Sequence, residues 1–172
     1  VNYVTVTGSE YDGSFFTNFN YRQFPGTTAE QDTGSLPTIA WGQGGTNGNV
    51  FAGGVSNGTL GCSGMIWNKR KVTAYKSWFF FPDETVALGS GITETGGTAN
   101  VYTTLNQTNF NAVEGVSYEK GGVVTTTKTA TNFNVVAPNW LYHGNIGYAN
   151  LDSSPTQSFV VNTNNSVVSM AV

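Results

Sequence analysis

The stretch KSWFFFPDETVALGSGI, Lys76–Ile92, places four aromatic residues in a row before a proline, two acids and an apolar segment broken by glycine. Side chains alternate between the two faces of a strand, so Trp78 and Phe80 share one face while Phe79 and Phe81 share the other. Aromatic residues on both faces predict a central strand that stacked sheets cover on both sides. Burying each phenylalanine would contribute roughly 1.5–3 kcal/mol, so we expect this block to form core.

Pro82, Asp83 and Glu84 follow the aromatic block and raise the question of a catalytic acid pair. Proline cannot donate a hydrogen bond to a sheet, so Pro82 is expected to end the strand. A working acid–base pair needs a carboxyl group with a raised pKa in a pocket, and a solvated turn does not provide one. We therefore interpret Asp83 and Glu84 as the turn between two strands.

The rest of the chain repeats the same pattern of short period-two runs, beginning with VNYVTVTG at residues 1–8. No stretch repeats apolar residues with the spacing of a helix over two turns. The sequence predicts an all-β fold, an antiparallel β-sandwich with essentially no helix, in a single domain over residues 1–172. Turns are expected at Ser56-Asn57-Gly58, Pro82-Asp83-Glu84, Gly96-Gly97, Lys120-Gly121-Gly122 and Asn164-Asn165.

Composition limits the partners. Only 10% of residues are charged and the net charge is −3, so the chain offers no surface for a run of phosphates and nucleic acid is not an expected partner. No apolar run reaches the roughly 20 residues that cross a bilayer. The chain begins with Val1 rather than methionine, and its polar, glycine-rich composition is typical of secreted all-β proteins. We expect an extracellular protein, with N-glycosylation candidates at Asn57, Asn106 and Asn164.

Four motifs in the same order carry a resemblance to a known family. They are FPGTTAE (Phe24–Glu30), FAGGVSNGT (Phe51–Thr59), the Lys76–Ile92 stretch and NWLYHGNIGY (Asn139–Tyr148). Together they resemble the central β-domain of polysaccharide lyase family 8, the hyaluronate, chondroitin and xanthan lyases. The resemblance covers residues 20–150 approximately and implies that family's β-supersandwich.

The resemblance carries over no catalytic residue. The family's catalytic Asn, His, Tyr and Arg belong to an N-terminal helical toroid, which this sequence lacks, and residues 1–21 lack the Gly-Glu-Asn motif of the family's β-domain. His143 is the only histidine and is expected to be a hydrogen-bonded structural group. No spacing of ligands indicates a metal, and no glycine-rich loop opens a helix, so no cofactor is predicted.

Three functions remain open. The first is a non-catalytic, lectin-like carbohydrate-binding protein that holds sugars on aromatic faces and amides; agglutinating cells would require multivalency, for example a homodimer. The second is an accessory β-domain of a family 8 lyase acting on hyaluronan, chondroitin or xanthan. A self-sufficient lyase or hydrolase is the least favoured. For each candidate sugar-binding residue, core packing is at least as good an interpretation, and for Trp140 it is the favoured one; the candidates are Trp41, Asn47, Asn49, Trp140, Tyr142 and His143.

Overall fold

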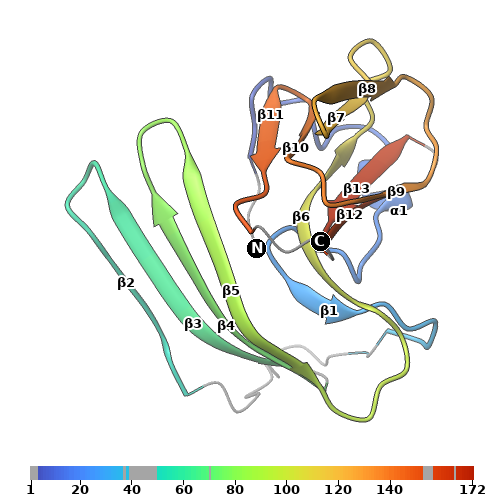
Figure 1. Ribbon diagram of the computed structural model, residues 1–172. Coiled ribbons are helices and arrows are strands. Elements are labelled where there is room, and N and C mark those ends of the chain that lie inside the picture. The colour runs from blue at the N-terminus through green and yellow to red at the C-terminus, as the bar shows by residue number, and fades with distance from the viewer. Residues whose placement is uncertain (1–3, 37, 39–49, 70, 153–156, 165) are drawn as a thin grey trace. The chain divides into compact units, whose positions relative to one another are not determined.

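The computed structural model describes residues 4–36, 38, 50–69, 71–152, 157–164 and 166–172. Within these ranges the chain forms thirteen strands and one helix of four residues, and every sheet is antiparallel (Figure 1). The all-β prediction is confirmed. Contacts along the backbone group the chain into two compact units, which we call unit 1 (residues 1–27 and 102–172) and unit 2 (residues 28–101). The expectation of a single domain stays a prediction.

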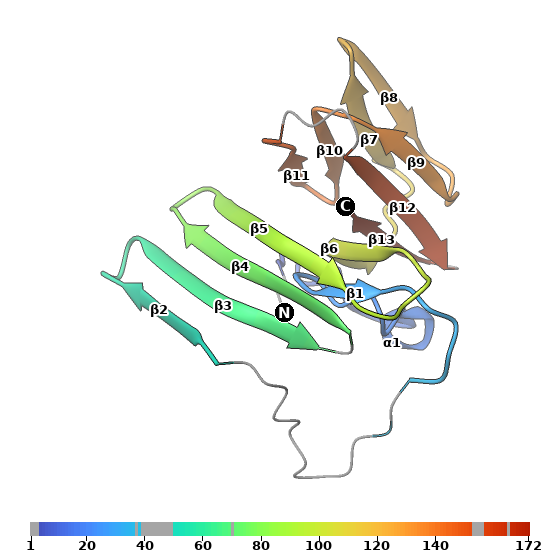
Figure 2. The same cartoon turned by 60° about the horizontal axis from the view of Figure 1, so that its bottom comes forward.

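Unit 2 contains a four-stranded sheet in the order β2-β3-β4-β5, whose long strands lie side by side (Figure 2). The Asn57–Leu60 segment turns the chain, with Asn57 Oδ1 accepting from the N–H groups of Thr59 and Leu60. The turn after the aromatic block is closed by Phe81 N–H donating to Glu84 O at 2.9 Å. The strands of this unit are β1 (Thr28–Glu30), β2 (Ala52–Ser56), β3 (Gly61–Lys69), β4 (Val72–Phe80) and β5 (Thr85–Glu94).

The aromatic block of β4 corrects the expectation of a core strand. β4 is central in its sheet, but the side chains of Phe79, Phe80 and Phe81 are 37%, 42% and 42% exposed. The buried side chains of the strand are Val72, Ala74 and Lys76, all before the aromatic block. Alternation along a strand predicts which side chains share a face of the sheet. It does not predict whether another segment of the protein covers that face.

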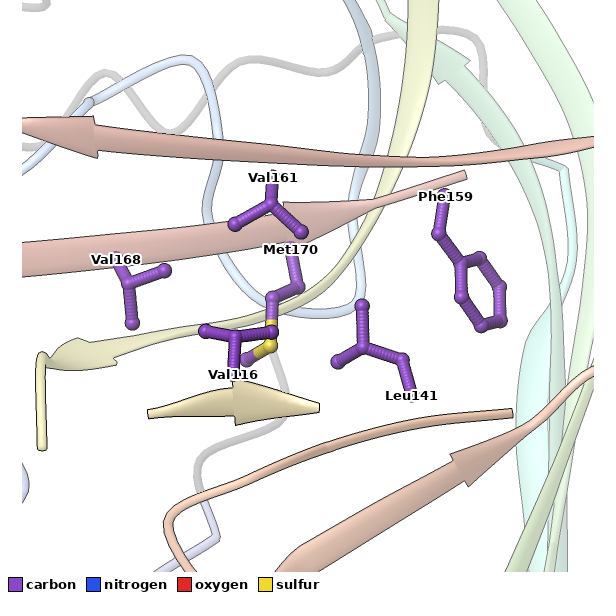
Figure 3. Close-up of a cluster of buried hydrophobic side chains, with 6 residues drawn as sticks. All are labelled: Val116, Leu141, Phe159, Val161, Val168 and Met170. Atoms are coloured by element: carbon purple, nitrogen blue, oxygen red, sulfur yellow. The ribbon is translucent and has the colours of Figure 1, made fainter. Parts of the chain in front are cut away.

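Unit 1 is a sandwich of two sheets. One sheet places β6, β13, β12 and β9 in that order, and the other has the order β11-β10-β7-β8. Six fully or nearly buried side chains from both sheets point toward one another in Figure 3: Val116, Leu141, Phe159, Val161, Val168 and Met170. The strands are β6 (Val101–Asn109), β7 (Val116–Lys120), β8 (Val123–Thr127), β9 (Phe133–Val136), β10 (Trp140–His143), β11 (Ile146–Ala149), β12 (Ser158–Asn164) and β13 (Val167–Ala171).

The N-terminal segment departs from the predicted strand. Residues 4–8 form no strand, because the Glu10 carboxylate accepts hydrogen bonds from the backbone N–H groups of Val6, Thr7 and Gly8 and curls the segment around itself. The Thr7 N–H first, and then the Val6 N–H, lower the pKa of Glu10 to about 2, against the opposing effect of burial. The short helix α1 (Phe15–Asn18) follows. Its buried Phe15 packs with Phe19 and Val167 in a second small core, flanked by Tyr11 and Phe24.

Candidate functional site

The outer face of β10 exposes two aromatic rings. Trp140 and Tyr142 are partly buried, whereas Leu141 and His143 between and after them are fully buried on the opposite face. Leu141 belongs to the core between the two sheets of unit 1, which fixes the orientation of the strand. Alternation therefore turns Trp140 and Tyr142 together toward solvent. We call the surface formed by Trp140, Tyr142 and their cross-strand partners Ser117, Glu119, Gly147 and Ala149 the β10 outer face.

Small residues flank the aromatic rings on one side. The backbone of Tyr142 pairs with Gly147 of β11, and that of Trp140 pairs with Ala149. A Cβ at Gly147 would have no atom within 4 Å, so the space beside Tyr142 is open. Directly paired residues share a face of the sheet, and these two bring no bulky side chain onto the rings. The arrangement leaves room for a flat ligand beside the aromatic pair.

Polar groups flank the rings on the other side. On β7 the Ser117 hydroxyl lies 2.8 Å from the hydroxyl of Thr126 on β8. The Tyr142 hydroxyl donates to Asn145 Oδ1 at 3.2 Å in the turn between β10 and β11. Hydroxyls both donate and accept, so these groups can exchange hydrogen bonds with a polyhydroxyl ligand. The β10 outer face thus combines aromatic surface with hydroxyl and amide groups at its edge.

Glu119 is the carboxylate of this face. Its backbone pairs with that of Trp140, so the two side chains lie on the same side of the sheet. The carboxylate accepts hydrogen bonds from Asn139 Nδ2 and from the backbone N–H of Gly122. These two bonds, one to each oxygen, hold the carboxylate in a fixed position beside the rings.

His143 does not belong to the exposed set, which corrects its place among the candidate sugar contacts. Its side chain is 1% exposed, and its ring stacks on Phe110 with the centroids 5.8 Å apart. His143 Nε2 accepts the Asn111 N–H at 3.1 Å, and Nδ1 lies 3.5 Å from the Thr108 hydroxyl. Burial lowers the pKa of His143, against the opposing effect of Glu114. The ring is a structural group, as the alternative interpretation of this histidine proposed, and offers no surface to a ligand.

The three other candidate sugar contacts, Trp41, Asn47 and Asn49, lie outside the described residues and stay predictions. Asn57 and Asn164 are exposed, in agreement with their place as candidate glycosylation sites, and glycosylation there also stays a prediction. Asn106 differs. It is 2% exposed and its Nδ2 donates to Tyr148 Oη at 2.7 Å, so the folded chain has no room for a glycan on that amide.

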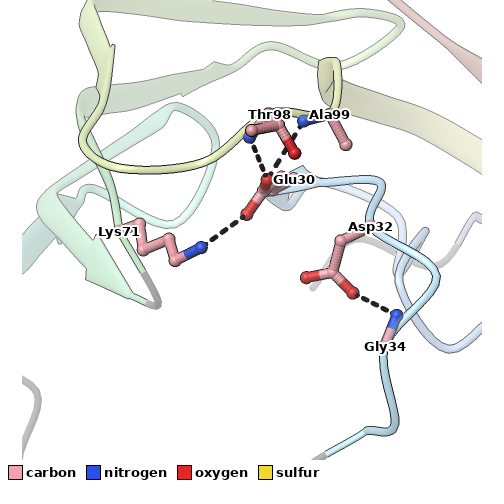
Figure 4. Close-up of polar contacts among 6 residues, drawn as sticks. All are labelled: Glu30, Asp32, Gly34, Lys71, Thr98 and Ala99. Atoms are coloured by element: carbon pink, nitrogen blue, oxygen red, sulfur yellow. Dashed lines mark hydrogen bonds and ion pairs between the residues drawn. The ribbon is translucent and has the colours of Figure 1, made fainter.

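The carboxylate of Glu30 in the FPGTTAE motif serves the fold. Its Oε1 accepts from the N–H groups of Thr98 and Ala99 at 3.0 and 3.2 Å, and its Oε2 lies 3.7 Å from Lys71 Nζ (Figure 4). The Ala99 and Thr98 N–H groups lower the pKa of Glu30, with a smaller contribution from Lys71. These contacts fasten β1 to the segment that follows β5.

The described residues also bear on the other kinds of site that the sequence raised, namely an acid pair and a metal site. Asp83 and Glu84 are exposed in their turn, as expected for a structural role. The described residues hold no group of three His, Cys, Asp or Glu side chains that could share a metal ion. Cys62 on β3 is a partly exposed free cysteine. None of the described helical segments has the length and apolar character to cross a membrane.

Sequence reasoning singled out Trp140 and Tyr142, which the fold places together. It missed Ser117, Glu119 and Gly147, which reach the same face from β7 and β11. The alternation of NWLYHGNIGY could have placed Gly147 opposite Tyr142 once a tight turn at Gly144-Asn145 was assumed. The pairing of β7 with β10 joins segments twenty residues apart and leaves no local signal.

Comparison with known proteins identifies relatives. Residues 1–168 match the family described as polysaccharide lyase family 8, super-sandwich domain. Chondroitinase-AC from Pedobacter heparinus is 37% identical over 163 residues, which cover 90% of this chain and 22% of that protein. Hyaluronate lyase from Thermasporomyces composti is 30% identical over 139 residues, or 77% of this chain and 17% of that protein.

Solved structures of polysaccharide lyases also resemble this chain. A chondroitinase AC lyase solved in complexes with oligosaccharides superposes with a TM-score of 0.69 at 30% identity, over 90% of this chain and 24% of that one. A Paenibacillus xanthan lyase has the same TM-score of 0.69 at 23% identity, over 96% of this chain and 18% of that one, and shows the shared fold. The chain thus spans less than a quarter of the length of these relatives.

Proposed function

The chain belongs to polysaccharide lyase family 8 as a super-sandwich domain, and from this premise we propose that it is a non-catalytic, lectin-like carbohydrate-binding domain. The observation that carries the proposal is the pair Trp140 and Tyr142, turned outward together beside hydroxyl and amide groups. The relatives named above are lyases of polysaccharides, which makes sugars the natural class of ligand.

The chemistry of the β10 outer face suits a pyranose ring. The C–H groups of a sugar present an apolar surface that packs on an aromatic face, and its hydroxyls need directional partners at the edge. Tyr142 provides both, since Gly147 leaves the space beside it open and Asn145 lies at its tip. Ser117 and Thr126 supply hydroxyls on the neighbouring strands.

A non-catalytic role is consistent with the functional groups that this chain offers. Breaking a uronic-acid glycosidic bond by elimination requires a group that removes a proton and a group that stabilises the developing charge. The single histidine, His143, is buried and hydrogen-bonded in unit 1, so it is unsuited to meet a substrate. We propose that such groups, where they exist in relatives, lie in the part of those chains that this sequence does not match.

The test is a binding titration with variants of the two rings. Hyaluronan, chondroitin and xanthan oligosaccharides, together with neutral oligosaccharides, would be titrated into the chain and followed by tryptophan fluorescence and calorimetry. Trp140→Ala and Tyr142→Ala should each weaken binding by about fivefold or more, because each removes a stacking surface worth about 1 kcal/mol. Tyr75→Ala is the matched control, since Tyr75 is 60% exposed but belongs to β4 of unit 2. Absence of binding to every sugar, or unchanged binding by both ring variants, would contradict the proposal.

A second candidate, the accessory domain of a larger lyase acting on chondroitin, hyaluronan or xanthan, is favoured by an apolar face in unit 2. Backbone pairing places Val55 and Phe79 on the face of the sheet that also carries Tyr75 and Leu88. These side chains are between 37% and 70% exposed. A contiguous apolar face of this kind marks an interaction surface.

The accessory role predicts a difference between the chain alone and a longer protein that contains it. The chain alone should bind an apolar dye such as anilinonaphthalene sulfonate, and Val55→Lys with Leu88→Lys should reduce that signal. In a longer protein that covers this face, the dye signal should be low before any substitution. Equal dye binding by both proteins would contradict this role. Secretion and a homodimer stay predictions.

A further inference from the structure

We propose that Glu119 makes the β10 outer face selective for uncharged sugar residues over uronates. This inference rests on the carbohydrate-binding function proposed above and names the class of sugar that the face takes. Glu119 is the charged residue of the β10 outer face. It lies on β7 and pairs directly with Trp140 of the neighbouring strand β10.

The Glu119 carboxylate is positioned in advance. Asn139 Nδ2 donates to Oε2, and the backbone N–H of Gly122 donates to Oε1. A carboxylate can accept about four hydrogen bonds, so these two contacts leave acceptor sites for a ligand. Hydrogen bonds from sugar hydroxyls to an ionised carboxylate are charge-assisted and stronger than neutral ones. A neutral hexose packed on Trp140 therefore finds a ready acceptor for its hydroxyl groups.

A sugar carboxylate in the same place is repelled by the charge of Glu119. In the described strands β7, β8, β10 and β11, the basic side chains are Lys120 and His143. Alternation turns Lys120 to the face opposite Glu119, and His143 is buried. The strands thus supply this face with no cation to offset Glu119, and the chain as a whole carries a net charge of −3. Like charges at close range disfavour binding even near the surface.

The experiment uses matched pairs of ligands. Methyl glucoside and methyl glucuronide differ only in carrying a hydroxymethyl or a carboxylate group, and the galactose pair offers the same comparison. Binding to the chain would be measured by ligand-observed NMR at low and high salt. We expect each neutral glycoside to bind about two- to fivefold more tightly than its uronate at low salt, the range of an exposed charge interaction. High salt should narrow the difference.

Glu119→Gln is the decisive variant. It keeps the shape of the side chain, and Asn139 can turn its amide to accept from the new Nε2. The variant should bind the uronate about two- to fivefold more tightly than the wild type does, and the salt dependence should disappear. Glu84→Gln removes the same charge from an exposed turn in unit 2 and should leave the preference unchanged.

The outcomes separate this inference from the function on which it rests. If neutral and acidic glycosides bind equally and Glu119→Gln changes neither, the charge selection is wrong while carbohydrate binding stands. If no glycoside or oligosaccharide binds the wild type, the binding function itself is overturned. A preference for uronates that depends on Trp140 would also overturn the selection proposed for Glu119.

Discussion

Lys76 Nζ lies 5.6 Å from the centroid of the Trp78 ring, two residues further along the same face of β4. The ammonium group also donates to the Thr28 hydroxyl at 2.9 Å, and the lysine side chain is 7% exposed. The fold thus buries a lysine whose cationic form gains from the ring quadrupole but loses most of its hydration. The loss of hydration is the stronger effect, because burial lowers the pKa of Lys76 to about 8.

The lowered pKa predicts that the free energy of unfolding rises with pH in an alkaline window. Between about 8, the pKa in the folded chain, and 10.5, its ordinary value, the unfolded state holds a proton at Lys76 that the folded state has released. Stability therefore increases as pH rises through this window, by at most about 3 kcal/mol. Urea unfolding at several pH values between 7 and 10, followed by tryptophan fluorescence, measures the slope.

Lys76→Met provides the control, since it keeps an unbranched apolar side chain and removes the titrating group. The variant should lose the rise between pH 8 and 10 that belongs to Lys76 and should be at least as stable as the wild type at neutral pH. Lys69→Met, on a partly exposed residue of β3, should leave the rise intact. An identical slope in wild type and Lys76→Met would refute the assignment.

Gly97→Ala should destabilise unit 2. A Cβ at position 97 would overlap Oε1 of both Glu30 and Glu94. Glu30 cannot move away without losing its hydrogen bonds from Thr98 and Ala99. We expect a loss of about 1–3 kcal/mol in the free energy of unfolding, measured by urea titration.

Gly53→Ala is the matched control for Gly97→Ala, because a Cβ at Gly53 lies 3.8 Å from the Phe51 ring, which is ordinary contact. It should change stability by less than about 0.5 kcal/mol. If Gly97→Ala is as harmless as Gly53→Ala, the crowding of the two carboxylates is not a feature of the folded chain.

The buried histidine predicts an effect of the same cause, loss of hydration on burial, but in an acidic pH window. Burial lowers the pKa of His143 below its ordinary 6.5, so below that pH the unfolded state takes up a proton that the folded state resists. The stability contributed by the neutral ring is present above pH 6.5 and is lost as the pH falls toward the folded pKa. His143→Gln keeps an acceptor for the Asn111 N–H and should flatten the pH dependence of unfolding between 6.5 and 5. A steeper or unchanged profile would contradict it.

The sequence predicted the hairpins well because their signals are local. Asn57-Gly58 and Pro82-Asp83-Glu84 turn the chain where expected, since these residues set the backbone geometry of a turn by themselves. The strand expected at the start of the chain was wrong over residues 4–8 because of a competing local interaction. One carboxylate, Glu10, captured three backbone N–H groups that a strand would need, and alternation does not report such competition.

Burial was harder to predict than strands. The composition of the aromatic block gave no sign that Phe79 and Phe80 would be more than one-third exposed, because exposure depends on a covering layer outside the local sequence. The sequence predicted the aromatic residues of the candidate site but not its carboxylate. Trp140 and Tyr142 follow from alternation within one strand, whereas Glu119 reaches them through the β7–β10 pairing, which no local pattern announces.

A matched pair of valines tests the contrast between the two units. Val161 of β12 is fully buried in the core of unit 1, whereas Val55 of β2 is 70% exposed. Val161→Ala removes two buried carbons and leaves a cavity, so unfolding should become easier by about 2–3 kcal/mol. Val55→Ala should lower the free energy of unfolding by less than about 0.5 kcal/mol, because the two carbons that it removes bury little apolar surface in the folded chain. Urea titration monitored by circular dichroism measures both. A cost at Val55 equal to that at Val161 would mean that the outer face of β2 is covered in solution, for instance by a second copy of the chain, and that unit 2 is not exposed as described.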